Sequence, residues 1–183
     1  LARTAHLHGC THIATGHHAD DQAETVLMRV LRGTTGKGLA GIPAVRELAG
    51  VRLVRPLLRT RRETILRYLH AIGADHREDV TNGDEAILRN RVRHGLIPQL
   101  AREYNPQVVD ALCRLAEMQY DANDVIRQRT GELILACYHD GAIDLVEFAR
   151  GPVACQRELL ADCAERIGID IEFDRIERAR LFI

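Results

Sequence analysis

THIATGHHADDQAETVLMRVLRG, residues 11–33, joins a short apolar segment to a helical pattern through a glycine. Residues 11–16 are suited to a buried parallel strand, because they are few, have Ile13 and Ala14 at their centre and end in glycine. From about Ala19 to Leu31 the apolar residues recur with a helical period, and Gly33 ends the pattern. A strand followed at once by a turn and a helix is typical of a parallel α/β unit.

The predicted helix has an acidic face and an apolar face. At about 100° per residue, Asp20, Asp21 and Glu24 fall on one side. The opposite side carries Ala19, Ala23, Val26, Leu27 and Val30. The carboxylates lie in the first turns, where the helix dipole favours negative charge, and follow the carboxyl end of a strand, where open α/β sheets place ligands. A solvated helix cap is one interpretation, but beside His17 and His18 the acids also suit Mg²⁺ with a nucleotide phosphate.

Helical patterns dominate the rest of the chain. We expect the end of a helix at residues 2–9, a loop over 33–50, a strand within 51–58, and an amphipathic helix over 61–72. A further helix is capped at Thr81 or Asn82 and runs toward Pro98. One long helix follows over 106–137, then a short strand in IDLVEF (143–148) and helix again from Val153. The chain is therefore predicted to be α/β in its first part and mostly helical in its second.

The composition, 46% hydrophobic and 28% charged over 183 residues, is that of an ordinary globular chain. No apolar run approaches the roughly 20 residues of a membrane-spanning helix, so we expect no membrane contact. Five cysteines without CxxC spacing favour free thiols in a reducing cytoplasm over disulfides or a zinc site. Residues 1–102 carry 16 Lys and Arg against 10 Asp and Glu, whereas 103–183 carry 9 against 16. The basic first half favours a polyanionic partner.

GHHADDQAETVLMRVLRGTTGKGLAGI (16–42) resembles the second signature of the tRNA(Ile)-lysidine synthetase family, a member of the N-type ATP pyrophosphatase (PP-loop) superfamily. The fitting positions are His17, Asp20, Asp21, Glu24, Thr25, Arg32, Gly33, Leu39 and Gly41. A second block fits as well, with RPLL (55–58), Glu63, Tyr68, D-x-T-N (79–82), RNRVR (89–93) and Pro98. The resemblance covers residues 1–120 clearly.

The resemblance implies the C-terminal part of a parallel-sheet, adenine-nucleotide alpha-hydrolase-like domain at 1–125. Part of a small helical substrate- or tRNA-binding domain would follow at 126–183. The family's members are bacterial, cytoplasmic ligases that use ATP to join L-lysine to C2 of the wobble cytidine in tRNA(Ile) with a CAU anticodon. The C2 oxygen is adenylated with release of pyrophosphate, and the lysine amine then displaces AMP. A homodimer is left open.

The resemblance also implies roles for single residues. The implied catalytic residues are His17, Asp20, Asp21 and Glu24, and Asp21 and Glu24 would also hold Mg²⁺. Nucleotide and tRNA phosphates would meet Arg32, Gly33, Arg55, Arg89, Asn90 and Arg93. Arg89 and Arg93, four residues apart, are expected to share a helix face while Arg91 points elsewhere. For Asn82 and Asn90, a turn or capping role is an equal alternative.

One element of the family's pattern is missing from the sequence. The family's nucleotide site needs an S-G-G-x-D-S loop whose backbone N–H groups cradle pyrophosphate, and these 183 residues contain none. The family places this loop upstream, so we expect the middle of a longer enzyme that is inactive by itself. Two alternatives stay open. A tRNA thiolase of the same superfamily predicts cysteine pairs, and a non-catalytic helical RNA-binding module predicts salt-dependent tRNA binding without an ATP effect.

Overall fold

The computed structural model describes residues 1–34, 36–75, 88–139, 141–169 and 172–182. The chain divides into two compact units, Leu1–Met118 and Gln119–Ile183. No helix in these ranges combines the length and apolar character that crossing a membrane requires. The assignment of a nucleotide domain to residues 1–125 and of a substrate domain to 126–183 stays a prediction.

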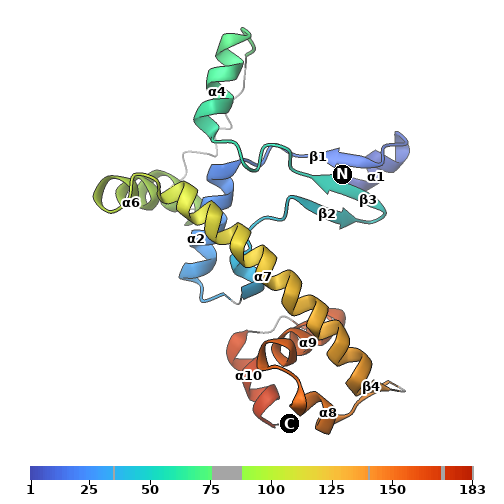
Figure 1. Ribbon diagram of the computed structural model, residues 1–183. Helices are drawn as coiled ribbons and strands as arrows, with labels where there is room; N and C mark the ends of the chain where they lie inside the picture. The colour runs from blue at the N-terminus through green and yellow to red at the C-terminus, as the bar shows by residue number, and fades with distance from the viewer. Residues whose placement is uncertain (35, 76–87, 140, 170–171, 183) are drawn as a thin grey trace. The chain divides into compact units, whose positions relative to one another are not determined.

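The first unit mixes a small sheet with several helices (Figure 1). Its elements are α1 (Ala2–Leu7), β1 (His12–Ala14), α2 (Ala19–Leu31), α3 (Gly36–Leu39), β2 (Val45–Leu48), β3 (Val51–Val54), α4 (Arg62–Ala71), α5 (Leu88–Arg91), the π-helix η2 (Val92–Leu96) and α6 (Ile97–Glu103). Helix α7 (Val108–Cys137) begins in this unit. Strand β1 pairs in parallel with β3, so the predicted α/β class is confirmed.

The sheet has the order β1-β3-β2, and β2 pairs with β3 in antiparallel fashion. Strand β2 and helix α3 lie within residues 33–50, which were predicted to be a loop, so that prediction was wrong. The turn between β2 and β3 uses Ala49 at φ +48° and Gly50 at φ +80°, the left-handed pair that suits a two-residue hairpin. Because β2 is almost wholly exposed, it lacks the apolar alternation that marks a half-buried strand.

Helix α2 begins and ends where its sequence predicts. The His18 ring accepts the backbone N–H of Asp21, and the Asp21 side chain accepts the backbone N–H of His18, which forms a capping box. Gly33 lies beyond the last turn at φ +71°, the left-handed conformation that commonly ends helices. Ala23 and Val26 are completely buried, as the predicted apolar face requires, while Val30 on the same face is exposed.

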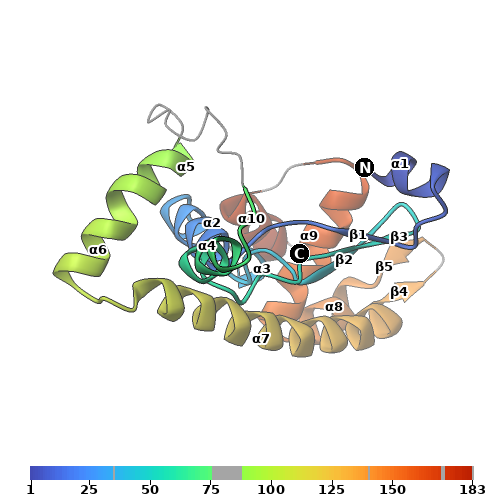
Figure 2. The same ribbon diagram turned by 90° about the horizontal axis from the view of Figure 1, so that it is seen from above.

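Helices α5 and α6 follow each other without a break, joined by the π-helical turn η2 (Figure 2). Pro98 lies in the first turn of α6. It has no N–H to donate to the carbonyl of the preceding turn, and its ring would clash there in regular α geometry. A wider π turn just before it relieves this conflict. The predicted cap of this helix at Thr81 or Asn82 lies outside the described residues.

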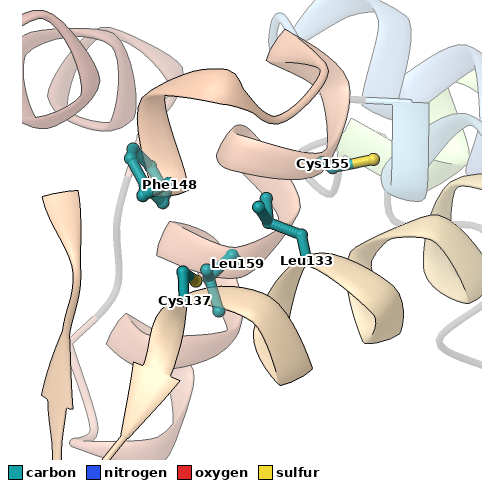
Figure 3. Packing of buried hydrophobic residues seen from close by; sticks show 5 residues of the cluster. All are labelled: Leu133, Cys137, Phe148, Cys155 and Leu159. Atoms are coloured by element: carbon teal, nitrogen blue, oxygen red, sulfur yellow. The ribbon is translucent and has the colours of Figure 1, made fainter. Parts of the chain in front are cut away.

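The described residues of the second unit form the end of α7, a two-stranded sheet and three further helices. The elements are β4 (Tyr138–His139), β5 (Ala142–Ile143), α8 (Leu145–Arg150), α9 (Val153–Arg166) and α10 (Phe173–Phe182). Its core contains Leu133, Cys137, Phe148, Cys155 and Leu159 (Figure 3). The predicted strand at IDLVEF was wrong beyond Ile143, because the Asp144 carboxylate accepts the backbone N–H groups of Val146 and Glu147 and starts α8.

Candidate functional site

The carboxyl ends of the two parallel strands meet at one edge of the sheet. The backbone N–H of Thr15, directly after β1, donates to the carbonyl of Val54 at the end of β3, with N···O 3.0 Å. His17 follows, and its Nδ1 lies 3.0 Å from Oγ1 of Thr15. Arg55 follows β3 at the same edge. This is the edge at which open α/β sheets bind ligands.

A cluster of two acids and two arginines, the acid–arginine cluster, lies on the predicted acidic face of α2. Its members are Asp21, Glu24, Arg89 and Arg93. Oε2 of Glu24 accepts Nε of Arg89 at 2.8 Å and Nη2 of Arg93 at 3.0 Å, and Oε1 accepts Nε of Arg93 at 2.6 Å. Glu24 is only 1% exposed. Its hydrogen bond raises the pKa of the Arg93 guanidinium, against the opposing effect of burial.

Asp21 completes the cluster and ties it to the start of α2. Its Oδ1 accepts Nη2 of Arg89 at 2.9 Å and Nη2 of Arg93 at 3.0 Å. Its Oδ2 accepts the backbone N–H of His18 at 2.9 Å. Each guanidinium therefore bridges both carboxylates, an arrangement that combines charge with fixed geometry. The predicted common face of Arg89 and Arg93 is confirmed, and Arg91 is exposed.

Asp20 makes a separate contact with residues that the sequence reasoning missed. Its Oδ1 accepts Nε and Nη2 of Arg61 at 3.2 and 3.0 Å, and its Oδ2 accepts the backbone N–H of Arg62 at 2.7 Å. Burial alone would raise the pKa of the Asp20 carboxyl, but the Arg62 N–H and the Arg61 guanidinium outweigh burial and lower it. Arg61 also lies 3.4 Å from Asp110 of α7. Asp20 thus fastens the start of α2 to α4.

The geometry of Asp21 and Glu24 does not fit their predicted role as Mg²⁺ ligands. Both oxygens of each carboxylate already accept N–H donors. Mg²⁺ needs near-octahedral oxygen ligands, and here guanidinium or backbone N–H groups already contact all four carboxylate oxygens. A cation at these two residues would require both arginines to move away. Within the described residues, no group of three or more His, Cys, Asp or Glu side chains is arranged to hold a metal ion.

The other predicted residues lie outside the acid–arginine cluster. Arg32 caps the end of α2 with an exposed side chain, and Gly33 provides the left-handed residue there. Arg55 donates through Nη1 to the carbonyl of Pro43 at 2.6 Å. Asn90 is buried on α5. The D-x-T-N block at 79–82 lies outside the described residues.

Two further side chains of α2 hold the glycine-rich segment 36–42. Gln22 accepts the backbone N–H of Ile42 at 2.6 Å and donates to its carbonyl at 3.2 Å. Arg29 donates through Nη1 to the carbonyls of Gly38 and Gly41 at 2.6 and 2.8 Å. The glycines of this segment indicate a backbone whose carbonyl groups other residues can reach. The sequence does not indicate which side chains bind these carbonyls.

Comparisons with known proteins point to one group. Residues 1–100 match the PP-loop domain family. The curated tRNA(Ile)-lysidine synthase of Symbiobacterium thermophilum is 42% identical over 137 residues, which are 75% of this chain and 28% of the relative. That of Geobacter sulfurreducens is 41% identical over 156 residues, 82% of this chain and 32% of the relative. That of Solibacter usitatus is 49% identical over 108 residues, 59% of this chain and 24% of the relative.

Among solved structures, the U34-tRNA thiolase NcsA from Methanococcus maripaludis with its [4Fe-4S] cluster matches with a TM-score of 0.50. The match is 19% identical and covers 63% of this chain and 38% of that chain. This likeness supports the fold alone. The chain spans about a quarter to a third of the length of the three curated relatives.

Proposed function

The chain belongs to the PP-loop domain family, and from this premise we propose that it takes part in joining L-lysine to the wobble cytidine of a tRNA(Ile) with a CAU anticodon, at the expense of ATP. The observation that carries the proposal is the acid–arginine cluster. It unites Asp21 and Glu24 of the first matching block with Arg89 and Arg93 of the second, more than 60 residues away, on the helix that follows β1. The same residues carry the resemblance to the lysidine-forming ligases.

The proposed reaction has two steps. The C2 oxygen of cytidine attacks the α-phosphorus of ATP, and the bond to pyrophosphate breaks. The lysine amine then attacks C2, AMP leaves with that oxygen, and the amine loses a proton. Negative charge grows on the departing phosphates in both steps, so preorganised cationic donors at the reaction site lower the barrier. Mg²⁺ would be supplied as the companion ion of the ATP substrate and would not be bound by Asp21 and Glu24.

Within this proposal Arg89 and Arg93 meet phosphate oxygens with the N–H groups that the carboxylates leave unused. In each arginine, Nε and Nη2 are the atoms that contact Asp21 and Glu24. Asp21 and Glu24 hold the two guanidinium groups in place. His17, oriented by Thr15, and Asp20 complete the polar surface. Arg32, Gly33 and Asn90 are proposed to line the nucleotide or tRNA path.

The whole activity belongs to a longer protein in this proposal. The chain contains no S-G-G-x-D-S loop, so we expect no turnover from these 183 residues alone. A cytoplasmic location follows from the tRNA substrate, and the five free cysteines fit a reducing compartment. The homodimer that the resemblance left open forms no part of the proposal.

The adenylation step offers a direct test. A longer form that carries the S-G-G-x-D-S loop would be incubated with α-labelled ATP and a tRNA(Ile) transcript bearing CAU, without lysine. We expect label on the tRNA and its release as AMP when lysine is added. A transcript with uridine at the wobble position should stay unlabelled. Label on lysine instead of tRNA, or sulfur transfer to the tRNA, would replace the proposal by another PP-loop chemistry.

A further inference from the structure

Three arginines lie around residues 38–43 of the first unit, which we call the clamp segment. Arg29 of α2 donates to the carbonyls of Gly38 and Gly41, and Arg55 donates to the carbonyl of Pro43. Two residues of chain span at most about 7 Å, so the carbonyls of Gly41 and Pro43 are close neighbours. The two guanidinium groups therefore approach the same short stretch of backbone from a helix and from a strand end.

Arg46 joins this pair from the β2–β3 hairpin. The register places Arg46 opposite Leu53, and the backbone N–H of Arg55 donates to the carbonyl of Ala44. Arg46 and Arg55 are therefore diagonal neighbours on one face of the hairpin, within reach of long side chains. Burial lowers the pKa of the Arg55 guanidinium, and the positive charge of Arg46 lowers it further. Two like charges are thus held beside each other.

In the described part of the chain these three arginines have no acid partner, in contrast to the arginines that contact the acids in the first turns of α2. Arg61, Arg89 and Arg93 each pair with a carboxylate. Among the residues that the structure describes, neither Arg29 nor Arg55 forms an ion pair, and both bind backbone carbonyls only. The buried Nε of Arg55 has no hydrogen-bond partner there either. Partly buried positive charges without a counter-charge are costly, which indicates that an anion completes this surface.

The position of these arginines and the chemistry of their side chains indicate which kind of anion binds. Arg55 directly follows β3 at the carboxyl edge of the sheet, where ligands of α/β proteins bind. The planar guanidinium group can donate two N–H groups to two oxygens of one phosphate. Resting on the tRNA-directed function proposed above, we propose that Arg29 and Arg46 join Arg55, for which the family resemblance already implies a phosphate contact, in binding one phosphate group over the clamp segment. The group comes from the RNA backbone or from a nucleotide.

Binding of two probes by the full chain tests this site. Arg46→Gln and Arg55→Gln variants would be titrated with pyrophosphate and with a CAU anticodon stem-loop at several salt concentrations. Each variant is expected to weaken binding of at least one probe about tenfold, as the loss of a charge-assisted hydrogen bond does. For the RNA, the salt dependence should fall by about one ion per arginine.

Arg52→Gln is the matched control. Arg52 lies in β3, just before Arg55, but its side chain is on the opposite face of the hairpin. It is exposed and forms an ion pair with Glu47 at 3.2 Å. Its replacement should therefore leave the affinities for both probes unchanged. Weakened RNA binding alone assigns the site to the RNA backbone, and weakened pyrophosphate binding assigns it to the nucleotide. Wild-type affinities in both folded variants, or no binding of either probe by the wild type, would overturn the site. Because no lysine transfer is measured, arginine-dependent binding would survive a failure of the ligase function.

Discussion

At the scale of single residues, Glu24 presents the sharpest electrostatic problem. A carboxylate that is 1% exposed has lost nearly all of its hydration, and an isolated buried charge is strongly unfavourable. Arg89 and Arg93 offset this loss through three hydrogen bonds of 2.6 to 3.0 Å. The stability of α2 against α5 and η2 therefore depends on keeping both signs of charge together.

Replacing Glu24 by alanine leaves two guanidinium groups facing one carboxylate. We expect the free energy of unfolding to fall by about 3 kcal/mol, the lower end for a broken buried pair because both arginines keep some solvent access. Urea denaturation followed by circular dichroism measures this. Glu47→Ala, on an exposed ion pair with Arg52, is the control and should leave the midpoint unchanged. Equal midpoints for both variants would contradict the account of the cluster.

Gly41 is needed for two separate reasons that a matched pair of variants separates. Its φ is +65°, and a Cβ there would lie 2.5 Å from Oε1 of Gln22, which is held by Ile42. Gly73 has the same φ with open space around it. Gly73→Ala should cost about 1 kcal/mol from backbone strain alone, and Gly41→Ala roughly 2–3 kcal/mol because crowding adds to it. Equal losses in thermal unfolding would show that Gln22 does not restrain the clamp segment.

The sequence predicts part of the site at this scale and misses the rest for a physical reason. The acidic face of α2 and the common face of Arg89 and Arg93 follow from helical periodicity. Their pairing does not, because opposite charges 65 to 72 residues apart in sequence leave no local pattern. Arg61 was missed for the same reason. The metal role of Asp21 and Glu24 assumed open carboxylates, which the arginines occupy.

At the scale of elements, capping decides between helix and strand in the second unit. The residues IDLVEF read as a strand because their apolar content fits either structure. Asp144 settles the choice, since its carboxylate accepts N–H groups of Val146 at 2.8 Å and Glu147 at 3.2 Å. In contrast, the predicted bounds of α2, Ala19–Leu31, agree with the structure, because the apolar face of the helix and its terminal glycine both indicate the same helix.

Asp144→Ala removes the cap of α8 and should lower the free energy of unfolding by about 1 kcal/mol. Phe148 lies on this helix and is buried in the core of the unit, so the loss should appear in global unfolding by urea. Asp144→Asn keeps a capping oxygen and should retain most of the stability. If Asn and Ala destabilise equally, the charge of Asp144 and not its capping geometry is what matters.

The contact between α9 and α10 predicts a pH dependence. Hydrogen bonds from Arg157 and then from Arg180 lower the pKa of Glu177 from 4.5 to about 2. A carboxyl with a lowered folded-state pKa contributes stability that is complete above pH 4.5 and is lost as pH falls toward 2. We therefore expect stability to fall over this window and the Glu177→Gln variant to lose less of it. The Arg157→Gln variant lacks the main cause of the lowered Glu177 pKa, so this contribution to stability should be lost over a narrower pH range. An unchanged pH profile in both variants would contradict this.

At the scale of the whole molecule, charge divides with the two units. Residues 1–118 carry 17 Lys and Arg against 13 Asp and Glu, whereas 119–183 carry 8 against 13. The acid–arginine cluster and the three arginines around the clamp segment (Arg29, Arg46 and Arg55) all lie in the first unit. We therefore expect the first unit to carry most of the salt-dependent contact with RNA. The composition predicts that the first unit is basic and the second acidic. It does not predict which arginines form ion pairs with acids of the same chain.

The most direct measurement is mass analysis of the nucleosides of tRNA(Ile) after reaction with ATP, Mg²⁺ and lysine. It would be made on this chain and on a longer form that carries the S-G-G-x-D-S loop. The account predicts one lysine joined to the wobble cytidine with the longer form, and unmodified cytidine with the 183 residues alone. A folded longer form that leaves the cytidine unchanged or adds sulfur to the tRNA would contradict it, and so would efficient lysine addition by the chain alone.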